Sequence, residues 1–401
     1  MNEKSTATPR IGKPNKPCPD FPLFAHATGR WAKKIRGKTH YFGRWDDPDD
    51  ALQLYLDQKD DLHAGRQPRE ASDSLALREL ANAFLASKRS DVDTGRRSPR
   101  TFSDYHRVCV MLVDEFGANR AVTDIRPMDF EKLHHKMARN YSLTALGRYI
   151  TMARSLFKYG YDNEMIEKPV KFGTKFKVPS KSDRRIEKAR TRQKNGKRMF
   201  EATEIRSMLD KARPQLRAMI LLGCNGGLGN TDCAALPLSA IDLEGGWLDY
   251  ARVKTGIERR IPLWPETIAA LREVIAKRRE PHDSEHSNTL FLTKYRQPWV
   301  RYELVDVKKF GKRDLKIKQD DAIAKQTAKL LRELGIKRPG VGFYALRHTF
   351  ETVAGGSRDQ VAVDAIMGHI DGSMASEYRE GILDERLLAV TDHVRKWLFG
   401  D

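Results

Sequence analysis

Apolar and polar positions alternate with two different periods along the chain. Between residues 21 and 44 the apolar runs are short, and Thr28-Gly29 and Arg36-Gly37 stand between them. Glycine-containing dipeptides of this kind connect neighbouring strands of a sheet. The pattern predicts three short strands, over residues 21–26, 30–35 and 38–42.

A helical period takes over at Leu75. Apolar residues then recur at steps of three and four, beginning with Leu77 and Leu80, and this spacing puts them on one face of a helix. The stretch predicts four helices in about a hundred residues. We expect the last of them to begin after Ser142, because a serine hydroxyl is a good N-cap.

The second half of the chain mixes both periods. Thr203 is the expected N-cap of its first helix, and apolar residues from Leu383 to Trp397 predict an amphipathic terminal helix. A Lys-Thr-Gly turn at residues 254–256 predicts a hairpin. The other predicted elements are strands over residues 247–251, 259–263 and 290–292 and a long basic helical region over 306–332. The fold class is therefore mainly α with small β elements.

Shifts in composition predict the domain boundaries. Residues 1–20 are polar and contain four prolines, which predicts a flexible leader. Residues 171–198 hold 12 Lys or Arg against 2 acids and show no apolar period, so we expect a linker that tracks phosphates or a plain disordered tether. The expected domains are a small basic sheet over 21–66, a helical domain over 74–170 and an α+β domain with a tail helix over 199–401.

The charge of the chain indicates a polyanionic partner. Its formal net charge is +19 over 401 residues, and an excess of that size is typical of proteins that bind nucleic acid. No apolar run approaches the ~20 residues of a membrane span, and the first residues lack an apolar signal core. We expect a cytoplasmic, nucleoid-associated protein. The four cysteines are scattered, which is typical of reduced core residues and not of a metal site.

Side chains that can act on a phosphate occur in a fixed order near the end of the chain. Arg347 and His348 lie in LRHTF, His369 follows in MGH, and Tyr378 stands nine residues later. The order and both local contexts resemble the catalytic domain of the tyrosine recombinases, the phage integrase family. The turn at Lys254, followed by a basic strand that ends in Ile-Pro-Leu, resembles the catalytic lysine hairpin of that family.

The resemblance implies a site-specific DNA recombinase or integrase that uses neither a metal ion nor a cofactor. Tyr378 would attack a phosphodiester and form a 3′-phosphotyrosyl bond, which conserves bond energy so that strands can be rejoined without ATP. Arg347 would hold the phosphate with its planar fork, His369 would donate to the same oxygens, and Lys254 would protonate the leaving 5′ oxygen. Tyr344 stands where the family often has a histidine.

One position departs from the family pattern. The residue that should be the first catalytic arginine is Gly229, although Asp232 stands where the family has an acid. Losing one preorganised donor costs about 10²–10³ in rate. Three explanations are open: another arginine enters the site, the enzyme is slow but sufficient, or the protein binds DNA without cleaving it. The arginines considered as substitutes are Arg252, Arg259 and Arg260, around the lysine hairpin.

The resemblance also implies how DNA is held. The sheet over 21–66 resembles arm-type DNA-binding domains, or it is a structural hairpin packed on the next helix; its basic residues include Arg30, Lys33, Lys34, Arg36 and Lys38. The domain over 74–170 resembles the core-binding domain of the family. Arg148 and Arg154 on its last helix are phosphate contacts or ordinary exposed charges, and Arg184 and Arg185 lie in the basic linker.

The expected partner is double-stranded DNA at attachment sites, bound by a homo-tetramer. The terminal helix would dock on a neighbouring subunit or on its own domain. Two other functions remain open from the sequence: an architectural DNA-binding protein on the same fold, suggested by Gly229, and a topoisomerase-like enzyme with the same nucleophile.

Overall fold

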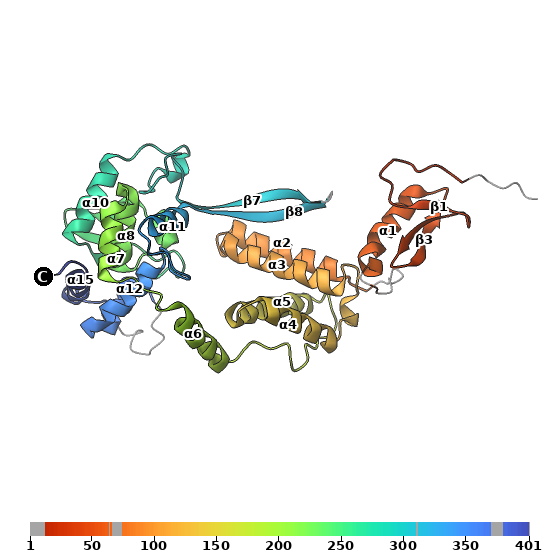
Figure 1. Cartoon of the computed structure of the whole chain (residues 1–401), viewed down its shortest axis with the longest axis horizontal. Helices are drawn as coiled ribbons and strands as arrows, with labels where there is room; N and C mark the ends of the chain where they lie inside the picture. The colour runs from red at the N-terminus through yellow and green to blue at the C-terminus, as the bar shows by residue number, and fades with distance from the viewer. Residues whose placement is uncertain (1–12, 64, 66–73, 310–311, 370–379, 401) are drawn as a thin grey trace, which may run out of the picture. The chain divides into compact units, whose positions relative to one another are not determined.

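The computed structural model describes residues 13–63, 65, 74–309, 312–369 and 380–400. It divides the chain into two compact units, Met1–Arg184 and Arg185–Asp401 (Figure 1). The first unit contains two hydrophobic cores and the second contains one. Helices predominate and the sheets are small, which confirms the predicted fold class.

The first unit begins with a three-stranded antiparallel sheet in the order β1-β2-β3. Its strands are β1 (Phe24–His26), β2 (Arg30–Ile35) and β3 (Lys38–Arg44), and helix α1 (Pro48–His63) packs on it. Trp31 and Phe42 are buried in the core of this sheet together with Tyr55 from the helix. A register shift between Trp31 and Ala32 buries both residues although they are adjacent. The sheet has the predicted strands, with β1 three residues shorter.

The rest of the first unit is built from helices around a second core. Its helices are α2 (Leu77–Asp93), α3 (Pro99–Phe116), α4 (Pro127–Asn140) and α5 (Leu143–Asp162), with a 3₁₀ turn at Val122–Asp124. Phe130 lies at the centre of the core, where its ring contacts those of Phe116 and Phe157. Ser142 accepts a hydrogen bond from the Ala145 amide. The four helices and this cap are as the apolar period predicts.

A helix also crosses the segment expected to be an irregular linker. α6 (Lys181–Asn195) has no buried residue, so the sequence shows no apolar period there. Ser180 and Asp183 form reciprocal hydrogen bonds at its start, and this pairing satisfies two otherwise free amides. Lys, Arg, Glu, Ala and Gln favour the helix intrinsically. The apolar period therefore did not indicate a helix here, and the assignment of residues 171–198 as a basic linker stays a prediction.

The second unit is arranged around the buried helix α8. In chain order its first elements are α7 (Ala202–Lys211), α8 (Pro214–Gly226), α9 (Asn230–Ala234), the antiparallel strands β4 (Ile241–Asp242), β5 (Trp247–Asp249) and β6 (Arg260–Pro262), and α10 (Pro265–Ala276). Asn225 on α8 donates to the Pro262 carbonyl oxygen and accepts from the Trp264 amide and the Thr267 hydroxyl. These bonds fasten β6 and α10 to α8. The N-cap of α7 is Glu201 and not Thr203 as predicted.

A two-stranded antiparallel ribbon replaces most of the predicted basic helix. β7 (Val300–Lys309) pairs with β8 (Lys312–Asp321) along its whole length, and only α11 (Ala322–Glu333) is helical. The prediction over residues 306–321 is wrong for this reason. Residues 290–292 are buried as expected, but Leu292 makes only an isolated bridge to Pro298.

The last elements are α12 (Ala345–Ala354), a 3₁₀ turn at Gly355–Ser357, α13 (Gln360–Met367) and α15 (Asp384–Phe399). α15 packs against α7, α12 and α13 of its own unit and buries Leu387, Val390 and Leu398. Its Thr391 carbonyl oxygen accepts a 3.0 Å hydrogen bond from the Trp264 indole. None of the described helices has the length and apolar character that crossing a membrane requires.

Candidate active site

α12 buries Arg347, one of the predicted catalytic residues. Leu346 and Phe350 hold one face of α12 in the core, and Arg347 is only 3% exposed. Its guanidinium donates to the carbonyl oxygens of Gly227 and Met367, both at 2.7 Å. Burial, and then the positive charge of nearby groups, lower the pKa of Arg347 to about 10. The side chain is still a cation at neutral pH, and main-chain oxygens fix its position.

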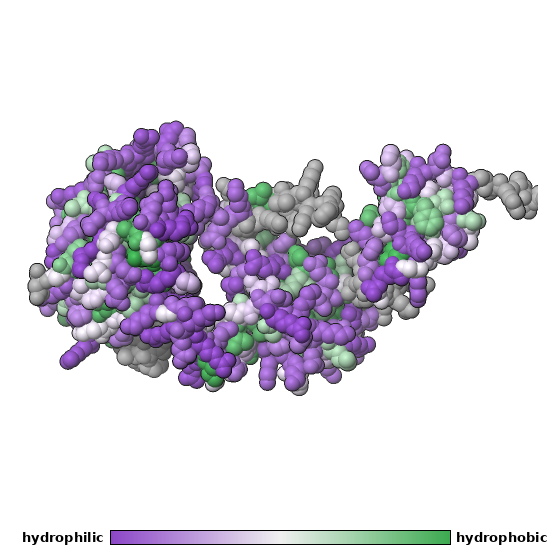
Figure 2. Space-filling model, in the orientation of Figure 1, coloured by the Kyte–Doolittle hydropathy of each residue, from purple (hydrophilic) through white to green (hydrophobic). Residues whose placement is uncertain are grey.

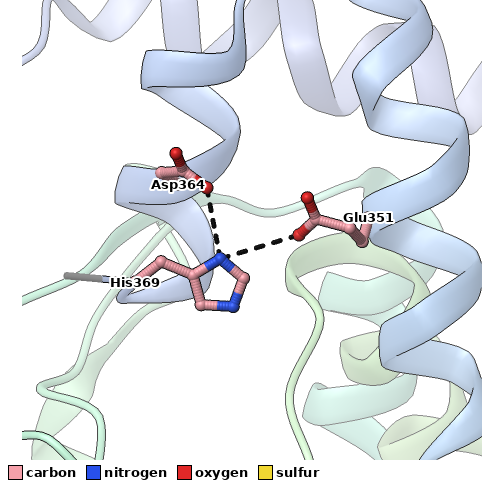
Figure 3. A group of neighbouring side chains, drawn as sticks. All are labelled: Glu351, Asp364 and His369. Atoms are coloured by element: carbon pink, nitrogen blue, oxygen red, sulfur yellow. Dashed lines mark hydrogen bonds and ion pairs between the residues drawn. The ribbon is translucent and has the colours of Figure 1, made fainter. Parts of the chain in front are cut away.

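His369 follows the end of α13, as expected. Gly368 ends that helix in the left-handed conformation with φ 60°, and the His369 amide donates to the Asp364 carbonyl oxygen. Figure 3 shows the His369 ring with Nδ1 directed at two carboxylates, at 3.1 Å from Asp364 and 3.7 Å from Glu351. Gln360 donates to both of these carboxylates. The arrangement holds a proton on Nδ1, and Nε2 has no hydrogen-bond partner among the residues that the structure describes.

These three side chains are also the group that could hold a metal ion. The ligand atoms of Glu351, Asp364 and His369 lie within 4.8 Å of one another. Hydrogen bonds among themselves and from Gln360 already account for the arrangement. Because Nδ1 would have to give up its proton to bind a metal, we interpret the carboxylates as groups that orient the ring.

The lysine hairpin is attached to the same helix end. Lys254 is exposed in the turn between β5 and β6. On one side of it, Arg252 donates to the Gly368 carbonyl oxygen at 3.1 Å, and on the other side the Thr255 hydroxyl donates to the same oxygen at 3.4 Å. Arg347 is bonded to Met367, one residue earlier. The turn that carries Lys254, the Arg347 side chain and His369 therefore lie at the short segment from Met367 to His369.

Gly229, where the family has an arginine, is buried at the start of α9. Its amide donates to Asp232 at 2.9 Å. A Cβ at Gly229 would lie 3.3 Å from the ring of Tyr344 and 3.5 Å from the Asp232 carboxylate. The φ of −94° is open to any residue, so the backbone does not require glycine. The space that a longer side chain would enter is occupied by the tyrosine ring.

Two other predicted catalytic residues belong to α12: Tyr344 directly precedes this helix and His348 lies on it. Tyr344 is 49% exposed, and its ring lies edge-on to that of His348 at 5.4 Å. Burial, followed by the positive charges of Arg198, Lys188 and Arg347, lowers the pKa of His348. This imidazole is therefore neutral over more of the physiological range than a free histidine.

The three arginines considered as substitutes face different surroundings. Arg259 is 3% exposed, donates to the Tyr250 carbonyl oxygen and pairs with Asp232 at 3.5 Å. Arg260, the next residue, points the other way and pairs with the exposed carboxylates of Asp249 and Asp384. Adjacent residues of a strand point to opposite faces. Only Arg252 combines partial exposure with a position beside His369.

Tyr378, the predicted nucleophile, lies outside the described residues. The described parts of its surroundings are Gly368 and His369 before it and α15 after it. Its role stays a prediction.

The basic residues of the N-terminal sheet differ in their freedom to bind DNA. Lys33 is half-buried, donates to the Pro22 carbonyl oxygen at 2.8 Å and lies over the Tyr55 ring. The residues with exposed side chains are Arg30, Lys34, Arg36 and Lys38. Figure 2 shows hydrophilic residues over most of the visible surface. A phosphate contact is therefore easier to reconcile with these four residues than with Lys33.

The two arginines predicted on α5 already have intramolecular partners. Arg148 pairs with Asp104 at 3.1 Å. Arg154 donates to the Phe176 carbonyl oxygen and lies over the ring of Phe172, so it fastens the chain after α5 to the helical core. Arg184 and Arg185 lie on α6 and have a half-buried and an exposed side chain, respectively. Their DNA contacts stay a prediction.

Two carboxylates beside His369 escape prediction from the sequence. Glu351 lies four residues after Arg347, on the same face of α12 one turn later, and Asp364 lies five residues before His369. The spacing of four is a signal that could have placed Glu351 near the site. Nothing local marks Asp364, because its position depends on the left-handed turn at Gly368.

Comparison with known proteins supports the same reading. The model of the phage integrase family matches residues 190–381. No curated protein sequence matches the chain.

Solved structures with a similar fold include three recombinases. The Tn1549 transposon integrase in complex with a circular intermediate DNA is 15% identical, with a TM-score of 0.52 over 80% of this chain and 100% of that one. A lambda integrase dimer bound to a COC′ core site is 14% identical, with a TM-score of 0.51 over 92% and 96%. The XerH site-specific recombinase bound to a palindromic difH substrate is 16% identical, with a TM-score of 0.50 over 72% and 78%.

At these identities the likeness shows a shared fold. The family match over residues 190–381, which includes Arg347, His369 and the lysine hairpin, shows that this part of the chain is a domain of the phage integrase family, the tyrosine recombinases.

Proposed function

We propose that the chain is a site-specific DNA recombinase or integrase that cleaves and rejoins DNA through Tyr378. The observation that carries this proposal is the meeting of three elements at one helix end. The Gly368 carbonyl oxygen accepts from both sides of the Lys254 turn, Arg347 donates to the Met367 carbonyl oxygen, and His369 follows directly. Groups of these types, held within a few residues of one another, suit a phosphodiester.

The proposed step exchanges one phosphate ester for another. The Tyr378 oxygen forms a bond to phosphorus and its phenol proton passes to solvent, while the bond from phosphorus to the 5′ oxygen breaks and that oxygen takes up a proton. Lys254 supplies the latter proton. Charge builds up on the non-bridging oxygens in the transition state, where the fixed Arg347 fork and Nε2 of His369 stabilise it. The reverse step rejoins a strand without ATP.

Double-stranded DNA containing an attachment site is the proposed substrate, and a homo-tetramer is the proposed assembly. The three solved recombinases described above are complexes with DNA, and the net charge of +19 favours a polyanion. We further propose that the reaction uses neither a metal ion nor a cofactor, since the positive charge near Arg347 comes from side chains. The exposed basic residues of the N-terminal sheet and of α6 are proposed to contact DNA backbone.

A covalent trap tests this function. Full-length protein is incubated with duplexes tiled across the DNA that flanks the encoding gene, each nicked so that the cleaved fragment diffuses away and the adduct accumulates. Wild type is expected to give a covalent protein–DNA species on denaturing gels. Tyr378→Phe should bind the same duplexes and give none. A wild type that binds but never forms an adduct would refute the catalytic proposal.

Gly229 favours a second candidate, a DNA-binding protein that does not cleave. It predicts site-specific binding without an adduct, and no loss of biological function in Tyr378→Phe. A topoisomerase-like activity would instead appear as relaxation of supercoiled DNA that contains none of the flanking sequence.

A further inference from the structure

The Tyr344 ring packs against Gly229 and takes up space that an arginine side chain at this position would need. The Tyr344 ring lies 3.3 Å from the point where a Cβ would begin, and the amide of Gly229 is engaged by Asp232. Tyr344 itself replaces the smaller histidine common in the family. A substitute cation must therefore enter the site from another direction.

Two of the three neighbouring arginines are unavailable. Arg260 is held outward by Asp249 and Asp384 and stacks on the Trp247 ring at 4.1 Å. Arg259 is enclosed, and its guanidinium is shared between Asp232 and the Tyr250 carbonyl oxygen. Its Nη1 has no hydrogen-bond partner among the described residues, but the side chain is 0% exposed, so a phosphate reaches Arg259 only if the groups that cover it move.

Arg252 has none of these constraints. Its side chain is half-buried, and one nitrogen donates to the Gly368 carbonyl oxygen at 3.1 Å. Among the residues that the structure describes, neither Arg252 nor Arg347 forms an ion pair with a carboxylate. The remaining guanidinium hydrogens of Arg252 have no described partner, so they are available to an anion.

Arg252 and Arg347 lie close enough for their charges to interact. After burial, the charge of Arg252 is the largest influence that lowers the pKa of Arg347. Their carbonyl partners, Gly368 and Met367, are adjacent in the chain. The two cations repel each other, Asp232 offsets only part of that repulsion, and an anion bound between them removes more of it. This is the electrostatic setting of a phosphate site.

We propose that Arg252 is the second phosphate-binding arginine of this recombinase and replaces the side chain that Gly229 lacks. The inference rests on the proposed function. Arg252 delivers its fork from the lysine hairpin, whereas Arg347 delivers its fork from α12. The hairpin therefore contributes both the proton donor and a charge that stabilises the transition state.

The test uses the same nicked duplexes and the full-length protein. Arg252→Ala is expected to slow adduct formation by about 10²–10³-fold while it retains duplex binding. Arg252→Lys should recover only part of the rate, because an ammonium group lacks the planar fork. The matched control is Arg260→Ala, on the same hairpin but directed away, and it should form adduct at the wild-type rate.

A modified substrate separates a catalytic role from a structural one. Replacing one non-bridging oxygen at the cleaved phosphate with a methyl group removes the negative charge that Arg252 would meet. The defect of Arg252→Ala should shrink on this methylphosphonate duplex, whereas a distorted hairpin would impair both substrates equally. Equal rates for Arg252→Ala and Arg260→Ala on the natural phosphate would overturn the inference. It would also be overturned if both Arg252 variants lost duplex binding as well as adduct formation. Absence of adduct from wild type would instead refute the proposed function.

Discussion

Gly368 is the residue at which one added methyl group tests the packing of the site most directly. Its backbone is left-handed, with φ 60°, and a Cβ there would lie 2.9 Å from Cδ of Arg259 and 3.1 Å from Cβ of Arg252. A left-handed alanine costs about 1–2 kcal/mol by itself. Because the Arg259 side chain is fully enclosed and bonded to Tyr250, it has little room to yield, and overpacking of this kind adds about 1–3 kcal/mol.

Gly335 provides a matched control for that substitution. Its φ is 69°, and a Cβ there would meet nothing within 4 Å, so Gly335→Ala carries the backbone cost alone. We expect Gly368→Ala to lower the free energy of unfolding of the second unit by about 1–3 kcal/mol more than Gly335→Ala. Hydrogen exchange of the α8 amides, followed by mass spectrometry on the full chain, measures this unit separately from the other. Equal losses in the two variants would refute the close packing of both arginines against Gly368.

Two further substitutions probe charge and docking in the same unit. Burial and the charges of Arg198, Lys188 and Arg347 lower the pKa of His348 in the folded chain. Below about pH 6.5 the unfolded chain therefore takes up a proton before the folded chain does. The contribution of neutral His348 to stability is complete above that pH and declines as the pH falls below it. His348→Gln should therefore flatten this part of a plot of unfolding free energy against pH, and an unchanged slope would contradict the assignment. Leu398→Ala should cost about 2–4 kcal/mol at every protein concentration, because α15 buries that residue in its own unit; a cost that appears only on dilution would favour exchange between subunits.

The spacing of apolar residues is sufficient to predict an element that buries one face. β2 occupies the predicted residues Arg30–Ile35, and the helix after Ser142 begins where its cap predicts. Apolar spacing does not predict α6, because this helix buries no residue. The Ser180 and Asp183 pair at its start is a capping signal that apolar spacing does not detect.

Apolar spacing does not predict the β7–β8 ribbon for a related reason. A two-stranded ribbon has no second layer of its own to demand strict alternation of apolar residues. The sequence predicts a basic helical region over residues 306–332, and β8 lies within it. Gly311 between runs that contain Val305, Val307 and Ile317 was the available indication of a hairpin.

The identities of the site residues could be predicted more completely than their arrangement. Arg347, His369 and Lys254 are recognisable from short contexts, and the structure brings their segments together. Which of the neighbouring arginines faces the site could not be read from the sequence, because strand alternation separates Arg259 from Arg260 without saying which face is buried. Only the carbonyl and carboxylate partners from distant segments decide this.

The docked final helix acts as a tether on the proposed nucleophile. Six steps along the chain separate Tyr378 from Asp384, the first residue of α15, and six extended residues reach at most about 20 Å. A phosphate beyond that radius is out of range while α15 stays in place. A subunit can therefore lend its tyrosine to a more distant strand only after its final helix has released.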